Sequence, residues 1–213
     1  MRQFSSRGYI VLVMIAYCIL ATIYFVQHYA WDNIFGITVA LPTLFATTLT
    51  AMRRRHGGWF IPLALGFSML GDYAGSTDNF TMQVAMFAVA HIFFICDFWP
   101  KRRYTAGGVI GALALVVAAT LYVMYILPSI EPAAFRQAIV IYAIIIVFMA
   151  TAAILQERKY RLCYIVAALL FVFSDGAIAY GMAMGQATTH LVMPTYYAAQ
   201  AIFTILYMLR KQS

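Results

Sequence analysis

Eight runs of about 20 mostly apolar residues follow one another along the chain, and they constrain the fold more than any other feature. A helix needs about 20 residues to cross the hydrocarbon core of a bilayer, so each run predicts one membrane span. The predicted spans are residues 8–27, 33–52, 58–75, 79–99, 105–127, 134–155, 162–184 and 191–209. The sequence therefore predicts an all-α polytopic protein whose residues 1–213 form a single integral membrane domain. We expect the first run to be a retained anchor helix and not a cleaved signal peptide.

The composition agrees with this fold class. Hydrophobic residues make up 64% of the chain and charged residues 10%, whereas about a quarter of the residues of a soluble domain are charged. The three cysteines all lie in apolar runs, which argues against a disulfide framework or a thiolate metal cluster.

The basic residues occupy both termini and every second loop. They are Arg2, Arg7, Arg53, Arg54, Arg55, Lys101, Arg102, Arg103, Arg158, Lys159, Arg161, Arg210 and Lys211. On the opposite side, Arg136 is the only basic residue. The positive-inside rule then predicts that both termini are cytoplasmic. We expect the membrane to be the inner membrane of a bacterium. This distribution accounts for the net charge of +7 without a nucleic-acid partner.

Two segments resemble each other weakly. "ALGFSMLGDYAG" aligns with "ALLFVFSDGAIAYG" when Asp72 is laid over Asp175. Basic clusters precede the two aspartates at nearly the same offset. We therefore consider a 4+4 parallel repeat about an axis along the membrane normal, as in some transporters. Chance resemblance between apolar segments explains the alignment at least as well.

Four ionisable residues lie inside the predicted spans: Asp72, His91, Asp97 and Asp175. A charged carboxylate at the centre of a membrane helix costs roughly 2.5–3.5 kcal/mol on insertion scales, so such residues are mostly functional. We interpret Asp97, close to the basic loop 101–103, as an interfacial ion pair. Asp72 and Asp175 are the candidate functional carboxyls. His91 fits a functional role and a satisfied core histidine equally well.

Further polar residues share faces with these groups. In the last span, Tyr196, Gln200, Thr204 and Tyr207 recur at helical spacing. Ser68 lies one turn before Asp72, and Ser174 directly precedes Asp175. These side chains line a polar cavity in one interpretation. In the other they hydrogen-bond neighbouring helices, which we favour for Ser68, Ser174 and Thr204.

Two buried carboxyls suit acid–base chemistry, because one can stay protonated while the other is ionised. Glycosidases use such a pair around an oxocarbenium-like transition state. The sequence lacks G-x-S-x-G and H-E-x-x-H motifs, and its lysines at the span ends do not suit a retinal Schiff base. A zinc site from His91, Asp72 and Asp175, completed by His28 or His190, is a less favoured alternative.

Four short motifs occur in order, each in a predicted span: "LGD" (70–72), "AH" (90–91), "FVFSDGAIA" (171–179) and "YYAAQ" (196–200). Together they resemble the YhhN-like lysoplasmalogenase family of eight-span membrane hydrolases. The sequence departs from the family at Phe94, where a tyrosine is common, and at Ile178, where a leucine is common.

The resemblance implies hydrolysis of the vinyl ether of a lysoplasmalogen to a fatty aldehyde and glycerophosphoethanolamine or glycerophosphocholine. Asp72 and Asp175 would be the catalytic pair, with Asp175 favoured as the acid because its depth favours the neutral form, although the roles can be exchanged. His91, Tyr196, Tyr197 and Gln200, with Ser68 and Ser174, would orient water or a carboxyl. We expect no metal or organic cofactor. The partners would be the lysophospholipid substrate and membrane lipids.

A small proton-coupled transporter is the competing function, because intramembrane aspartate and histidine residues also relay protons. A non-catalytic lipid-binding protein leaves the two aspartates unexplained. Replacing Asp72 by Asn distinguishes the first two classes in part: a carboxyl catalyst loses turnover but still binds lysolipid, whereas a carrier loses coupled flux.

Overall fold

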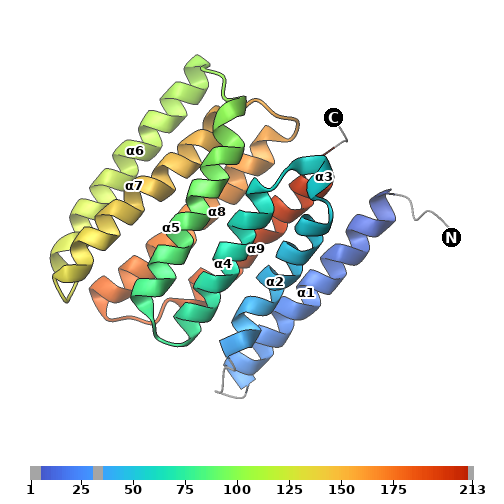
Figure 1. Cartoon of the computed structure of the whole chain (residues 1–213). Coiled ribbons are helices and arrows are strands. Elements are labelled where there is room, and N and C mark those ends of the chain that lie inside the picture. Colours follow the sequence, from blue (N-terminus) through green and yellow to red (C-terminus); the bar gives the residue numbers. More distant parts are fainter. Residues whose placement is uncertain (1–5, 31–35, 211–213) are drawn as a thin grey trace. The chain divides into compact units, whose positions relative to one another are not determined.

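The computed structural model describes residues 6–30 and 36–210, and every regular element in this part of the chain is helical (Figure 1). The α-helices are α1 (Ser6–Ala30), α2 (Gly36–Met52), α3 (Arg54–Gly57), α4 (Phe60–Ser76), α5 (Phe80–Phe98), α6 (Ala106–Ile126), α7 (Ala134–Leu155), α8 (Arg161–Met184) and α9 (Thr189–Met208). Two 3₁₀ turns, η1 (Trp99–Lys101) and η2 (Leu127–Ser129), follow α5 and α6. The predicted all-α class is confirmed.

The eight long helices match the eight predicted spans closely at both ends. Residues 33–35, with which the second predicted span begins, lie outside the described residues, as do Arg2 and Lys211. The one-turn helix α3 and the two 3₁₀ turns were not predicted. Each 3₁₀ turn has a proline at its start, and proline lacks the backbone N–H that would continue an α-helix.

Six helices of the described chain are long and apolar enough to cross a membrane. They are Gly8–Ala30, Phe80–Lys101, Ala106–Ser129, Ala134–Leu155, Arg161–Met184 and Thr189–Met208, where two include an adjoining 3₁₀ turn. The remaining two long helices, α2 and α4, have 17 residues each. The structure therefore supports an integral, multi-pass membrane protein.

The chain packs as two compact units. Unit 1 contains the residues up to Ala90 and those from Phe203 onwards, and unit 2 is His91–Ile202. From the sequence we expected a single membrane domain and considered a 4+4 repeat. Both stay predictions.

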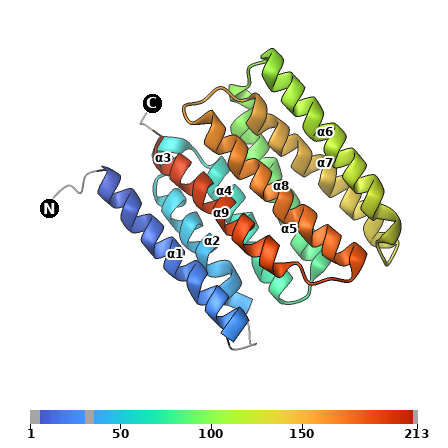
Figure 2. The same cartoon turned by 180° about the vertical axis from the view of Figure 1, so that it is seen from behind.

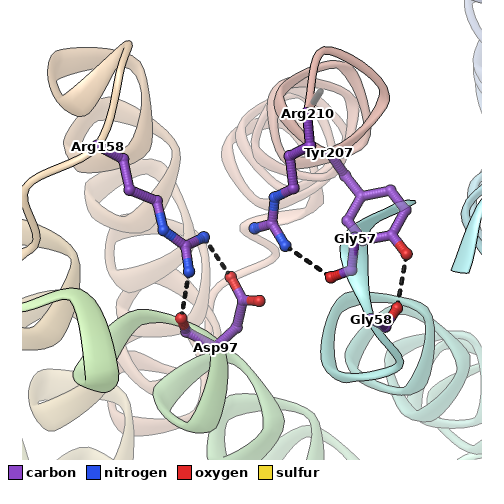
Figure 3. Close-up of polar contacts among 6 residues, drawn as sticks. All are labelled: Gly57, Gly58, Asp97, Arg158, Tyr207 and Arg210. Carbon is purple, nitrogen blue, oxygen red and sulfur yellow. Dashed lines mark hydrogen bonds and ion pairs between the residues drawn. The ribbon is translucent and has the colours of Figure 1, made fainter. Parts of the chain in front are cut away.

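Helix α2 packs against α4 and α1 in unit 1 (Figure 1), and the contact of α2 with α1 is also seen from behind (Figure 2). The packing uses small residues, among them Ala46 and Ala64, which are fully buried. The end of α9 is tied to the α3 turn: the Tyr207 hydroxyl donates to the Gly58 carbonyl at 2.6 Å, and Arg210 donates to the Gly57 carbonyl at 3.1 Å (Figure 3). Gly58 has a φ of +81°, which favours glycine at this turn.

Helices α6, α7 and α8 pack together in unit 2. A partly buried ion pair links the end of α5 to the α7–α8 loop, with Arg158 Nη1 2.7 Å from Asp97 Oδ2 (Figure 3). Arg158 Nη2 also donates to the Asp97 carbonyl at 2.6 Å. The expected ion pair of Asp97 is thus present, but its partner is Arg158 and not the neighbouring loop 101–103.

Candidate active site

Asp175 contacts two hydrogen-bonding side chains from other helices of unit 2. The Tyr142 hydroxyl, on α7, donates to Asp175 Oδ2. His91 Nε2, on α5, lies 3.4 Å from the same oxygen and 2.9 Å from the Tyr142 hydroxyl. The Asp175 side chain is only 7% exposed, and His91 is fully buried. Three helices therefore bring a phenol, an imidazole and a carboxyl together at one point.

The hydrogen bonds assign the proton of neutral His91. The Tyr142 hydroxyl uses its single hydrogen on Asp175, so it can only accept a bond from the imidazole. Nε2 must then carry the N–H and share it between the phenol oxygen and Oδ2. Nδ1 of neutral imidazole is consequently an acceptor. It is buried and has no hydrogen-bond partner among the described residues.

Aromatic rings hold the imidazole in place. The rings of Phe171 and His91 are nearly perpendicular to each other, with their centroids 4.9 Å apart. Phe94 is fully buried, with its ring centroid 6.4 Å from that of His91. The family that the sequence resembles often has tyrosine at position 94. Phe94 has no hydroxyl, so it adds only apolar packing beside the histidine.

Tyr142 was missed by the sequence analysis, which considered charged groups, histidines, the serines beside the two aspartates and the polar face of the last span. A signal was present, because Tyr142 interrupts the otherwise aliphatic run "IVIYAIIIV" of α7. A hydroxyl in the middle of such a helix usually has a partner. The sequence offered no indication of which carboxyl it would meet.

Asp72 lies in unit 1 with a hydroxyl partner of its own. It is 5% exposed, and Thr43, on α2, donates to its Oδ2 at 2.7 Å. Ser68, one turn earlier on α4, is fully buried, and its hydroxyl has no hydrogen-bond partner in the described chain. Thr43 is a second residue that the sequence analysis missed.

The remaining predicted residues are buried. The ring of Tyr196, on α9, packs edge to face with that of Phe171 at a centroid distance of 5.3 Å, so Phe171 contacts both Tyr196 and His91. The ring centroid of Tyr197 lies 5.6 Å from that of Tyr196. Gln200 and Ser174 are fully buried. The predicted polar face of the last span is thus buried along its whole length, since Thr204 and Tyr207 are buried as well.

No group of three or more His, Cys, Asp or Glu residues in the described part of the chain could hold a metal ion. His28, one ligand of the alternative zinc site, stacks on Tyr24 at a centroid distance of 5.8 Å. The described residues therefore give the zinc alternative no support.

The phenol–carboxylate–imidazole group can carry out proton transfer inside a membrane span. Its carboxylate can balance a nearby positive charge, and the free Nδ1 can accept a proton from a bound donor. Both abilities suit a reaction that passes through a cation.

Comparison with known proteins matches residues 34–206 to the YhhN family. No match was found among curated proteins or among solved structures. The matched region spans all four motifs on which the resemblance rested, and the family includes lysoplasmalogenases. The chain belongs to the YhhN family.

Proposed function

We propose that the protein hydrolyses the vinyl ether of lysoplasmalogens, giving a fatty aldehyde and glycerophosphoethanolamine or glycerophosphocholine. Membership of the YhhN family, which includes lysoplasmalogenases, supports this reaction class. The observation that carries the chemistry is the buried Asp175 carboxyl with Tyr142 and His91 on one oxygen. A carboxyl and an imidazole can serve as the acid or base groups of an acid-catalysed ether cleavage.

The reaction begins with transfer of a proton from an acid to the alkenyl carbon farther from the ether oxygen. This step leaves an oxocarbenium ion, as in glycoside hydrolysis. Water adds to the cationic carbon and loses a proton to a base, which gives a hemiacetal. The base then protonates the glycerol oxygen as the C–O bond breaks, and the hemiacetal hydroxyl returns its proton to the acid. One water is consumed, and both groups return to their starting states.

The contacts of Asp175 support the role of the carboxylate that stabilises the cation. Tyr142 and His91 both direct hydrogens at Oδ2, and an ionised carboxylate only accepts hydrogen bonds. This assignment exchanges the roles that we favoured from the sequence. Asp72, the second predicted carboxyl, is then the proton donor, and this part of the proposal rests on the sequence.

His91 is the proposed base. Its Nδ1 is a buried acceptor without a partner among the residues described, and a water molecule can donate to it. A proton taken up at Nδ1 makes an imidazolium whose other nitrogen already faces Asp175. A carboxylate that orients and stabilises a catalytic imidazolium has the role of the aspartate in serine hydrolases.

We also propose that all eight long helices cross the membrane, with both termini cytoplasmic, in a bacterial inner membrane. The basic loops follow α2, α5 and α7, whereas Arg136, near the start of α7, lies at the opposite end of that helix. Reporter fusions test this arrangement. A reporter that is active only in the cytoplasm should be active after residue 209 and inactive after residue 130.

The activity is tested with purified protein in detergent and 1-alkenyl-glycerophosphoethanolamine, following aldehyde release. The matched saturated 1-alkyl ether and the 1-acyl ester are the control substrates. Only the alkenyl ether can be protonated to an oxocarbenium ion, so it alone should release aldehyde. Absence of aldehyde from correctly folded protein, together with proton-coupled uptake in vesicles, would favour a transporter instead.

A further inference from the structure

Two basic loops of unit 2 are joined by backbone hydrogen bonds, and we call them the basic clamp (residues 101–103 and 156–161). Arg102 and Gln156 form an antiparallel bridge. Arg103 N donates to the Leu155 carbonyl at 2.8 Å, and Glu157 N donates to the Lys101 carbonyl at 2.7 Å. These bonds fix the two loops to each other.

The ion pairs compensate only part of the charge of the clamp. Arg158 pairs with Asp97, and Arg103 pairs with Glu157. The other four basic residues form no ion pair within the described chain; they are Lys101, Arg102, Lys159 and Arg161. Arg161 donates to the Ile154 carbonyl, a contact that leaves its charge in place. Four positive charges are therefore held together without a counter-charge.

The clamp adjoins the ends of four candidate membrane spans. Its loops connect candidate spans that end at Lys101 and Leu155 and resume at Ala106 and Arg161. Aromatic rings adjoin two of the cations that form no ion pair. Arg102 Cζ lies 4.5 Å from the Trp99 ring centroid, and Lys159 Nζ lies 5.0 Å from the Tyr160 ring centroid. Tryptophan and tyrosine are enriched at the membrane–water interface, where their polar and apolar parts are both satisfied.

We propose that the basic clamp binds the phosphate of an anionic membrane phospholipid. Clusters of Lys and Arg next to spans attract anionic lipids, and arginine matches the geometry of phosphate oxygens. The backbone hydrogen bonds already join the two loops. Binding of a headgroup therefore does not have to order their backbone, which favours one bound headgroup over a diffuse counter-ion layer. This site is independent of the proposed hydrolysis and serves to hold a lipid.

The test measures lipid retention by the purified full chain in detergent. Phosphatidylglycerol and phosphatidylcholine with the same acyl chains are titrated, and bound lipid is counted by native mass spectrometry. Lys101→Gln/Lys159→Gln removes two charges of the clamp, and these lysine side chains donate none of the hydrogen bonds of the described residues. Arg54→Gln/Arg55→Gln is the matched control, since it removes two exposed charges from the basic loop of unit 1.

Wild type should retain phosphatidylglycerol more strongly than phosphatidylcholine. The lysine variant should lose affinity for phosphatidylglycerol by roughly fivefold per charge, the factor that corresponds to about 1 kcal/mol per basic residue at an anionic surface. The arginine variant should keep the wild-type affinity. Equal retention of both lipids by wild type, or equal losses in both variants, would overturn the site. Equal thermal stabilisation by inorganic phosphate would show a free-anion site and overturn the lipid assignment.

Discussion

Tyr142 of α7 donates its hydroxyl hydrogen to Oδ2 of Asp175 on α8, and His91 Nε2 lies 2.9 Å from the same hydroxyl oxygen. The phenol therefore touches both proposed catalytic groups of unit 2. It fixes the position of the carboxylate and, by using its own hydrogen there, determines which nitrogen of neutral His91 carries the proton.

Tyr142→Phe should lower the rate of aldehyde release by roughly 10- to 100-fold, because a buried hydrogen bond to a charged group contributes about 1.5–3 kcal/mol. The aromatic ring and its packing remain. The kinetics of the purified variant check this. Tyr122→Phe is the control: its hydroxyl donates to the Gly176 carbonyl at 2.6 Å and not to a carboxylate, so its loss should be smaller. Equal losses in the two variants would mean that helix packing matters here and the Asp175 contact does not.

The sequence predicted most of the fold and part of the site. The eight long helices follow from apolar length alone, because hydrocarbon forces each span to satisfy its own backbone. Asp175 and His91 were both singled out, since an ionisable group at that depth is costly. Their direct contact was not predictable, because 84 residues separate them and apolar helices offer many packing arrangements. Tyr142 and Thr43 were missed for another reason. A neutral hydroxyl inside a membrane costs less free energy than an ionisable group, so the sequence does not mark it as functional, and only the packing shows its partner.

Asp97→Ala should lower the free energy of unfolding by on the order of 3 kcal/mol, because it leaves the partly buried Arg158 without its counter-charge. Thermal unfolding in detergent would show this as a clear fall in the midpoint. Arg103→Gln is the comparison, since its ion pair with Glu157 has both side chains more than half exposed and should contribute less than about 1 kcal/mol. A larger effect of Arg103→Gln would contradict the structural role given to the Asp97–Arg158 pair.

Gly57→Ala should destabilise unit 1, because the added methyl group would overlap the ring of Tyr207. We expect a loss of about 1–3 kcal/mol, typical of overpacking, measured as a lower thermal midpoint. Gly107→Ala, in the first turn of α6, meets no atom within 4 Å and should stabilise the protein by up to about 1 kcal/mol through helix propensity. Wild-type stability of Gly57→Ala would contradict the close approach of Tyr207 to the α3 turn.

Aldehyde formed in D₂O should carry one deuterium on the carbon next to the carbonyl. The proposed first step transfers a solvent-exchangeable proton to that carbon, and mass spectrometry of the trapped aldehyde detects it. Unlabelled aldehyde after a short reaction would exclude carbon protonation, whichever residue were the acid.

The central claim is that the buried carboxyl of Asp175 carries the chemistry. The most direct measurement is the rate of aldehyde release from 1-alkenyl-glycerophosphoethanolamine by wild type, Asp175→Asn and Asp78→Asn at equal amounts of folded protein. Asp78 is an exposed aspartate with a φ of +56° in the α4–α5 loop, and asparagine tolerates that conformation. We predict that Asp175→Asn loses activity by at least about a thousandfold, while Asp78→Asn keeps the wild-type rate. Near-wild-type turnover by Asp175→Asn would contradict the account.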